Sequence, residues 1–131
     1  MVRTYKKGSE AERELMKLLW KHGIGAVRVA GSGKAKSPTC DLVIGKSGKI
    51  LVVECKSTKK DAIYLEEDEV EKIRKLAEVW GCEALIGCRF ARSNWFFLKL
   101  NDIYPSRKIN RLDSEKENAM ELSELINYFE K

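Results

Sequence analysis

Apolar residues recur at three- and four-residue intervals over residues 9–22, a spacing that predicts an amphipathic helix. Ser9 is followed three residues later by Glu12, which is the spacing of a capping box at a helix start. Gly23 then provides a stop signal. The pattern therefore predicts a helix that begins near Ser9 and ends near His22.

A second helical repeat covers residues 66–80 and closes with Gly81. Its opening residues, 66–69, are all acidic, and negative charge is favourable at the N-terminal end of a helix dipole. A third helix is expected within residues 115–130. Helices are thus expected at both ends and in the middle of the chain.

Runs rich in β-branched and aromatic residues predict five strands between the first and last helices. They cover residues 26–30, 41–44, 50–56, 84–90 and 95–100. A Gly-Lys-Ser-Gly turn joins the second and third strands as a hairpin, and residues 31–39 form a loop. The order αβββαββα indicates a mixed α/β fold, with a central sheet flanked by helices in one domain over residues 1–131.

Composition supports this picture, since 44% of the residues are hydrophobic and only two are proline. The longest apolar stretches, such as residues 51–53, are far shorter than the roughly 20 residues that a membrane span requires. The basic N-terminus is not followed by the apolar run of a secretory signal. These features predict an intracellular, cytoplasmic protein without a membrane partner.

The formal net charge of +5 is distributed unevenly along the chain. Residues 1–60 hold 14 Lys or Arg against 5 acidic residues, whereas residues 61–131 hold 11 against 15. This asymmetry suggests a basic surface for a polyanion, with nucleic acid as the first candidate. The alternative is that the lysines only solvate loops and helix faces, and charge alone does not separate the two.

The four cysteines, at positions 40, 55, 82 and 88, form no Cys-x-x-Cys pair, and His22 is the only histidine. This combination argues against a zinc site and predicts reduced, buried thiols. Hydrolytic chemistry would therefore depend on carboxylates, lysine and a metal ion, unless His22 takes part.

Charged residues interrupt the third strand, which is otherwise apolar on both faces. Glu54 and Lys56 are two positions apart, so both point to one face with α-carbons about 6.6 Å apart. A hairpin turning about residues 46–47 would set Asp41 opposite Val52, on the same face as Glu54 and roughly 7–8 Å from it. Burying two carboxylates this close is costly unless a cation lies between them.

The arrangement therefore predicts a divalent metal site at Asp41 and Glu54. Such a metal could polarise a phosphate oxygen and lower the pKa of a bound water, while Lys56 could stabilise the hydroxide or the transition state. The alternative is a simple salt bridge between Glu54 and Lys56 at a strand end, with Asp41 capping the loop.

Asp41, Glu54 and Lys56 across a hairpin resemble the catalytic signature of the restriction-endonuclease-like nucleases, the PD-(D/E)xK fold. The basic leader of residues 3–14 and the sequence Val-Arg-Val-Ala-Gly-Ser at residues 27–32 more specifically resemble the archaeal Holliday junction resolvases. The resemblance implies a restriction-endonuclease-like fold and an endonuclease that resolves four-way DNA junctions during homologous recombination and DNA repair.

The resemblance extends from the N-terminus to about Tyr104 and returns in the last helix. Residues 105–118 match little and receive no role. The proline that directly precedes the aspartate in the family is absent, because Pro38 lies three residues before Asp41.

Carried over position by position, the resemblance implies that Glu12, Asp41 and Glu54 bind Mg²⁺, with Mn²⁺ as a substitute, and that Lys56 helps to activate water. Ser32 matches a loop serine linked to catalysis in some members. For Glu12, the capping box is a complete structural alternative.

Seven basic residues are expected to contact DNA phosphates: Arg3, Lys6, Lys7, Arg13, Lys34, Lys36 and Arg89. Arg13 matches a DNA-contact position of the family. The glycines and lysines of residues 31–39 suggest a loop that is mobile without DNA and closes over a strand on binding, bringing Ser32 to the scissile phosphate. A merely flexible surface loop is the alternative.

Symmetric cutting of a junction requires two active sites, which a homodimer would supply. Leu76 and Trp80 lie one helical turn apart and match apolar positions at the dimer contact of the resembled family. Ordinary core packing is the alternative for both. Accessory replication or repair proteins would be further partners.

Two other functions stay open at this point. A nuclease of the same fold could act on linear duplex, flaps or RNA instead of junctions. A non-catalytic DNA-binding domain could keep the fold without cutting. A comparison of junction and linear duplex cleavage, with and without magnesium, separates these functions.

Overall fold

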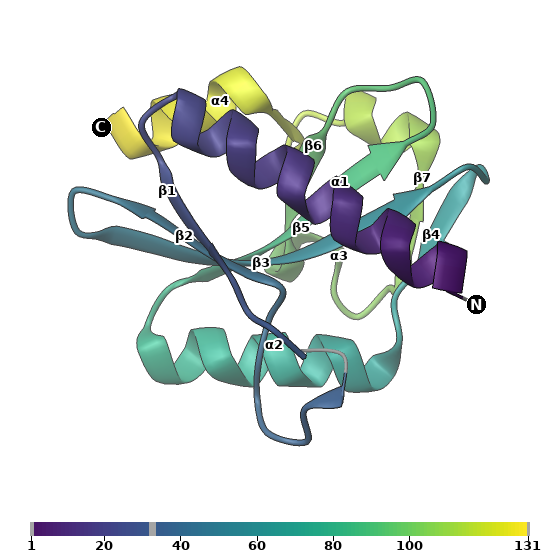
Figure 1. Cartoon of the computed structure of the whole chain (residues 1–131), viewed down its shortest axis with the longest axis horizontal. Coiled ribbons are helices and arrows are strands. Elements are labelled where there is room, and N and C mark those ends of the chain that lie inside the picture. The colour runs from purple at the N-terminus through teal and green to yellow at the C-terminus, as the bar shows by residue number, and fades with distance from the viewer. Residues whose placement is uncertain (1, 32–33, 131) are drawn as a thin grey trace.

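The computed structural model describes residues 2–31 and 34–130, and for residues 2–9 it describes the backbone alone. The helices are α1 (Val2–Lys21), α2 (Glu67–Trp80), α3 (Leu100–Ile103) and α4 (Leu122–Glu130), with a 3-10 turn η2 (Arg111–Glu115) (Figure 1). The strands are β1 (Gly25–Arg28), β2 (Leu42–Lys46), β3 (Lys49–Thr58), β4 (Ala62–Tyr64), β5 (Glu83–Phe90), β6 (Phe96–Lys99), β7 (Lys108–Asn110) and β8 (Met120–Glu121).

Six of the strands form one mixed sheet in the order β1-β2-β3-β5-β6-β8. Neighbouring strands are antiparallel except for β3 and β5, which are parallel and lie at the centre. Parallel neighbours need a crossover connection, and the segment containing α2 supplies it. The predicted fold class, a mixed central sheet flanked by helices, is confirmed.

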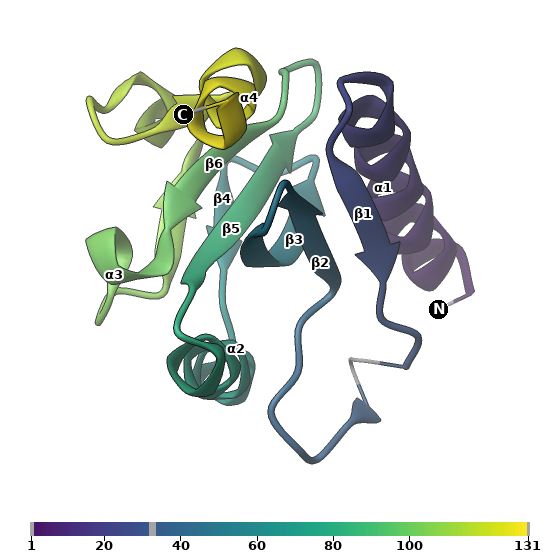
Figure 2. The same cartoon turned by 90° about the vertical axis from the view of Figure 1, so that its left-hand side faces the viewer.

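Helices cover both faces of this sheet. Figure 2 shows α1 and α4 on one face and α2 on the other. The apolar alternation along β3 explains how both layers are held, since Val52 packs with the α2 residues Val70 and Ile73, whereas Val53 packs with Leu15 of α1. Side chains at even positions of β3 therefore face α2, and those at odd positions face α1 and α4.

Helix α1 begins at Val2, seven residues before the predicted start. Ser9 lies inside the helix, so the predicted capping box of Ser9 and Glu12 is wrong. The basic leader continues the helix because its arginine and lysines are good helix formers, which outweighs the cost of Gly8. Glu12 is thereby freed from a capping role.

The β2–β3 hairpin turns at Ser47 and Gly48, which have φ values of 52° and 86°. Positive φ at both central residues is typical of the tight turn that matches the twist of paired strands. Lys46 consequently pairs with Lys49, so the predicted turn about residues 46–47 is displaced by one position. Each β2 residue therefore pairs with a β3 residue two positions later than predicted. Because side chains alternate with a period of two, each one still points to the predicted face of the sheet.

Two short strands, β4 and β7, form a second sheet that the sequence analysis missed. Ile63 and Ile109 pair at its centre, and both are buried in the core on the α2 side. Strand β7 lies within residues 105–118, which had received no role. This segment therefore contributes to the core that underlies the end of β3.

Candidate active site

Asp41 and Glu54 lie close together where β2 begins and β3 passes the middle of the sheet. The register pairs Leu42 with Val53, so its continuation sets Asp41 opposite Glu54 instead of the predicted Val52. The Asp41 N–H donates to the carbonyl of Val53 at 3.1 Å, and its Oδ2 accepts the N–H of Cys55 at 2.9 Å. These bonds fix the aspartate beside β3.

Glu54 is 9% exposed and faces the α2 side of the sheet. Burial raises the pKa of its carboxyl to about 9, and the charges of Asp41 and Glu69 reinforce the shift. Two carboxylates are thus held together in a place where one of them ordinarily keeps its proton. A bound cation would reverse this preference.

Lys56 is held by a residue that the sequence analysis did not select. Its Nζ donates to Oε2 of Glu69 at 2.5 Å, from strand β3 to the first turn of α2. Burial alone would lower the pKa of Lys56, but the hydrogen bond to Glu69 and the nearby carboxylates raise it above its ordinary value. Lys56 therefore lies in the site as an ammonium ion.

The sequence contained only a weak signal for Glu69. The acidic run 66–69 was interpreted as a match to the helix dipole, and the helix repeat does not say which of its acids faces the sheet. Only the packing of α2 against β3 distinguishes Glu69 from its neighbours.

Glu12 reaches the site region from α1. Its Oε1 accepts a hydrogen bond from Nε of Arg28 at 2.8 Å. Burial raises the pKa of Glu12, the Arg28 hydrogen bond opposes this rise, and the charge of Asp41 adds to it. Glu12 and Asp41 are therefore close enough to interact electrostatically, as the predicted metal-ligand set requires.

The oxygen donors of the site suit a hard divalent cation such as Mg²⁺. Among the residues that the structure describes, no three His, Cys, Asp or Glu side chains are already gathered to hold a metal ion. Glu12 is instead paired with Arg28, while Asp41 and Glu54 adjoin each other. The pair of carboxylates fits the chemistry of a metal, and Glu12 would have to turn from Arg28 to join it.

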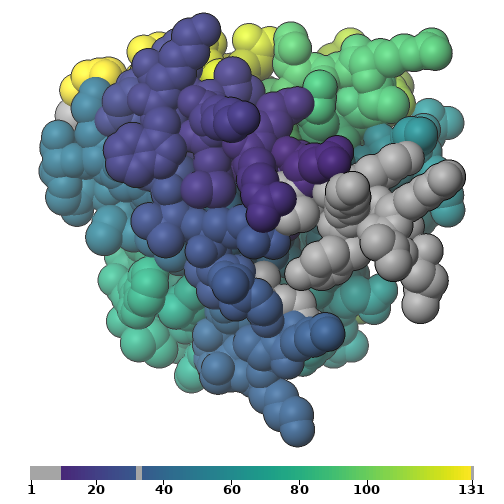
Figure 3. Space-filling view, viewed as in Figure 1, coloured from purple at the N-terminus to yellow at the C-terminus, as the bar shows by residue number. Residues whose placement is uncertain are grey.

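Several predicted site residues fall outside this description. Ser32 lies outside the described residues, and the side chains of Arg3, Lys6 and Lys7 do as well. Arg13, Lys34 and Lys36 are exposed. Figure 3 shows that side chains of α1 and of the loop after β1 (residues 34–39, blue) lie on the same face of the molecule.

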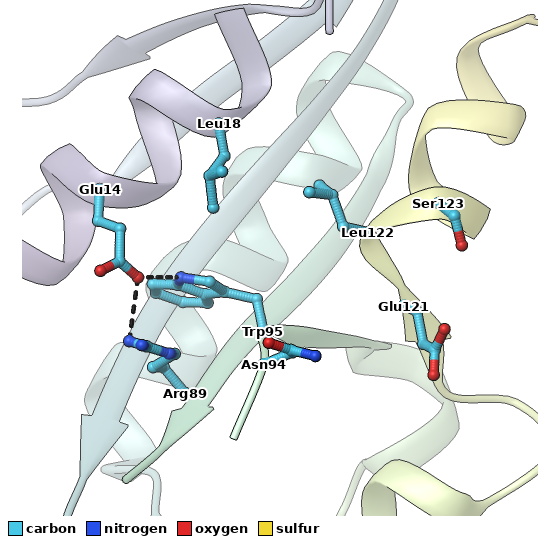
Figure 4. Close-up of a pocket in the computed structure, with 8 residues that line it drawn as sticks. All are labelled: Glu14, Leu18, Arg89, Asn94, Trp95, Glu121, Leu122 and Ser123. Carbon is cyan, nitrogen blue, oxygen red and sulfur yellow. Dashed lines mark hydrogen bonds and ion pairs between the residues drawn. The ribbon is translucent and has the colours of Figure 1, made fainter. Parts of the chain in front are cut away.

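Arg89, the predicted DNA contact from a later strand, is paired with other residues of the chain. It pairs with Oε1 of Glu14 at 3.0 Å and donates to the carbonyl of Ser93 at 2.9 Å. The same Glu14 oxygen accepts the indole N–H of Trp95 at 2.9 Å (Figure 4). Arg89 therefore has a structural role, and its contact with DNA stays a prediction.

The predicted dimer residues differ in their exposure. Leu76 is half-buried and packs against the core, as the alternative interpretation requires, whereas Trp80 is 53% exposed at the end of α2. Its neighbour Val79 is also exposed. The assignment of Leu76 and Trp80 to a dimer contact stays a prediction.

All four cysteines are free, as predicted. Cys40 and Cys88 are buried, and Cys55 and Cys82 are half-buried. Burial raises the pKa of the Cys40 thiol to about 12. These thiols are protonated at neutral pH and are poor metal ligands.

Comparison with known proteins identifies the family. Residues 3–131 match the family described as archaeal Holliday junction resolvase (Hjc). The chain belongs to this family. It is 35% identical over 124 residues to the crossover junction endodeoxyribonuclease Hjc of Archaeoglobus fulgidus, covering 94% of this chain and 91% of the relative.

Further similarities agree with this assignment. The Hjc protein of Methanocaldococcus jannaschii is 36% identical over 90 residues, which cover 69% of this chain and 64% of that relative. The solved structure of Archaeoglobus fulgidus Hjc superposes with a TM-score of 0.80 at 33% identity, covering 91% of this chain and 99% of the other.

Membership in the Hjc family confirms the resemblance, the fold class and the class of enzyme, a Holliday junction endonuclease. It also implies the use of a divalent metal and the binding of junction DNA. Across the described residues, no helix is both long and apolar enough to span a membrane.

Proposed function

We propose that this protein binds four-way DNA junctions and cuts them by hydrolysis that depends on Mg²⁺ held by Asp41 and Glu54. The observation that carries the proposal is the placement of a buried Glu54 beside Asp41, with Lys56 on the same face of β3. Such a concentration of negative charge in the protein interior costs stability unless it serves a cation. Mn²⁺ is expected to substitute.

The metal, when bound, would polarise a phosphate oxygen and lower the pKa of a coordinated water. The protein residues have separate tasks around it. Asp41, directly before β2, and Glu54 of β3 would provide oxygen ligands, and the backbone N–H of Cys55 orients Asp41. Lys56 offers an ammonium ion to the negative charge that develops on the phosphate.

Glu12 is proposed as the third ligand, supplied by α1. Arg28, its present partner, is then proposed to meet a DNA phosphate beside the site. Ser32 is proposed to approach the scissile phosphate from the loop after β1. Both assignments extend the resemblance residue by residue.

DNA would be held mainly through its phosphates by Arg3, Lys6, Lys7, Arg13, Lys34 and Lys36. Two copies of the chain, joined through Leu76 and Trp80 of α2, would present two sites to the two strands that must be cut. The exposure of Trp80 and Val79 supports this surface, because both are large apolar side chains at the end of one helix.

The test compares a four-way junction with a linear duplex of the same sequence, each with Mg²⁺ and with EDTA. We expect cleavage of the junction alone, only with Mg²⁺, and none by the Asp41→Asn variant at unchanged junction affinity. Preferential cleavage of linear duplex or RNA would indicate another nuclease of this fold. Junction binding without cleavage in any divalent metal would indicate a non-catalytic DNA-binding domain.

A further inference from the structure

The ammonium group of Lys56 faces three carboxylates but bonds to one of them. Glu54 and Asp41 both attract it, as does Glu69. Its hydrogen bond goes to Glu69, on a different element, at 2.5 Å. Both side chains of this pair are about one-quarter exposed, so water screens the bond only in part.

Glu69 is well placed to act as a fixed anchor. Its Oε1 accepts the N–H of Glu66 at 2.9 Å, which closes the capping box at the start of α2, while Oε2 accepts from Lys56. The next residue, Val70, is buried against the sheet. The carboxylate of Glu69 is therefore tied at one oxygen to the helix backbone and at the other to Lys56, and it also shares a side-chain hydrogen bond with Glu54.

The neighbouring acids of α2 do not share this arrangement. Asp68 pairs with Lys72 on the helix itself, Glu71 pairs with Arg74, and Glu67 is exposed. Of the acidic residues in the first turn, only Glu69 bonds to the strand that carries the proposed catalytic lysine.

A single ammonium among these carboxylates has two possible positions with different consequences. Beside Asp41 and Glu54, it would neutralise the charge that attracts a divalent metal and would occupy their oxygens. Beside Glu69, it stays on the same face of β3 without neutralising Asp41 and Glu54 by direct pairing. The charge and position of Glu69 favour the second arrangement.

We infer that Glu69 is a positioning residue, which holds Lys56 away from the metal-binding carboxylates and aims its ammonium at the reacting phosphate. The inference rests on the proposed function, because it assigns a metal to Asp41 and Glu54. Glu69 would be the fourth acidic residue of the proposed active site, after Glu12, Asp41 and Glu54. It comes from α2 and acts through Lys56.

The test uses Glu69→Gln, because glutamine retains an oxygen that can accept the Glu66 N–H but loses the charge that holds Lys56. The control is Glu71→Gln on the same helix, where only an exposed pair with Arg74 is lost. Single-turnover cleavage, junction affinity and the helical circular dichroism signal are measured for each variant.

We expect Glu69→Gln to lower the cleavage rate by about 10- to 100-fold, as for other residues that orient an active group. Junction affinity and helix content should change little, and Glu71→Gln should cut at the wild-type rate. A wild-type rate for Glu69→Gln would overturn the inference. So would an equal loss in Glu71→Gln.

A second measurement needs no cleavage. Mg²⁺ is titrated against the melting temperature of wild type, Glu69→Gln, Lys56→Ala and the double variant. Glu69→Gln should raise the Mg²⁺ concentration for half-maximal stabilisation several-fold, and Lys56→Ala should cancel this increase, because no ammonium is then left to compete. If the increase persists in the double variant, Glu69 does not act through Lys56 and the inference fails.

These outcomes are distinct from failure of the proposed function. If Asp41→Asn and Lys56→Ala both cut at the wild-type rate, the site itself is wrong. If both are inactive and Glu69→Gln is fully active, only the role given to Glu69 is wrong.

Discussion

Glu54 and Glu14 lie on opposite sides of the same sheet, and their surroundings are opposite as well. Glu14 accepts the indole N–H of Trp95 and pairs with Arg89, so its charge is matched by donors (Figure 4). Burial and the nearby charge of Asp41 raise the pKa of Glu54. The contacts of Glu14 stabilise the folded protein, whereas the burial of Glu54 beside Asp41 destabilises it.

The difference separates a carboxylate that we propose to bind metal from one with a structural role. An acid whose charge is met by donors, as at the exposed Glu14, stabilises the protein and needs no ligand. A buried acid beside another acid is costly, and proteins retain such arrangements at sites that bind or react. The two glutamates should therefore respond in opposite ways when each is altered.

The largest expected effect is on cleavage. Glu54→Gln should reduce the junction cleavage rate to below about a thousandth of wild type, beyond the loss of one transition-state hydrogen bond. Glu14→Ala should keep most of the rate but lower the free energy of unfolding by about 1–3 kcal/mol, because the Trp95 indole N–H loses its acceptor. Single-turnover kinetics and urea unfolding measure the two effects.

Glu14→Gln serves as the matched control for the second variant. Glutamine can still accept from Trp95, and the partly exposed pair with Arg89 is worth only about 0–1 kcal/mol. Strong loss of cleavage in Glu14→Gln, or a wild-type rate in Glu54→Gln, would show that the comparison assigns the two glutamates wrongly.

The next effect is on stability as a function of pH without metal. Because the pKa of Glu54 is raised to about 9, the folded protein keeps a proton there that the unfolded chain releases above pH 4.5. Stability from this group is therefore full below about pH 4.5 and is lost as pH rises towards 9, by at most about 1.4 kcal/mol per pH unit. Glu12, whose pKa is also raised, contributes in the same direction.

Urea unfolding in EDTA at pH 6, 7 and 8 measures this slope. Glu54→Gln should be more stable than wild type and should flatten the slope, and saturating Mg²⁺ should flatten it in wild type. The pH dependence from Glu69 has the opposite sign, because its pKa is lowered in the folded protein. Its contribution to the free energy of unfolding is present at neutral pH and is lost only in acid, below about pH 4.5. If the free energy of unfolding of Glu54→Gln depends on pH as steeply as in wild type, a group other than Glu54 takes up the proton.

Periodicity in the sequence was sufficient for the elements that bury apolar residues. Strand β3, with apolar side chains at both parities, and α2, with its repeat and Gly81, were predicted within one or two residues at most ends. The short strands β4 and β7 were not, because three-residue segments carry too little pattern to distinguish them from loops.

The site was predictable in part for the same reason. Asp41, Glu54 and Lys56 stand out because charge interrupts an apolar strand, and the side-chain alternation survives an error in the position of the turn. Glu69 and the pairing of Arg89 with Glu14 depend on which helix faces pack against which strands. Such contacts between distant segments follow from the tertiary fold and not from local spacing.

A smaller effect concerns DNA affinity. Arg13 is exposed on α1, whereas the charge of Arg89 is already engaged by Glu14. Arg13→Gln should reduce the slope of log affinity against log salt by about one unit, and Arg89→Gln by clearly less, since its pair must first be broken. Equal reductions would show that Arg89 leaves Glu14 when the junction binds.

The smallest expected effect concerns a contact on the α2 side of the sheet, between α2 and the loop after β1. On the α2 side, the loop after β1 is tethered, because Nζ of Lys72 donates to the carbonyl of Ala35 and pairs with Asp68 at 2.9 Å. The bond attaches one residue of the described part of the loop, residues 34–39, to α2. The expectation that residues 31–39 are mobile without DNA and close over a strand on binding stays a prediction.

Lys72→Met keeps most of the side-chain bulk and removes this tether. Amide exchange over residues 34–39 should quicken in the free protein, and junction affinity should fall by about threefold, because the loop then pays its ordering entropy on binding. Asp68→Asn is the control, since it removes the exposed pair but leaves the bond to Ala35. If Lys72→Met exchanges like wild type, the bond to Ala35 does not order the loop, and residues 34–39 are as mobile before DNA binds as the sequence predicts.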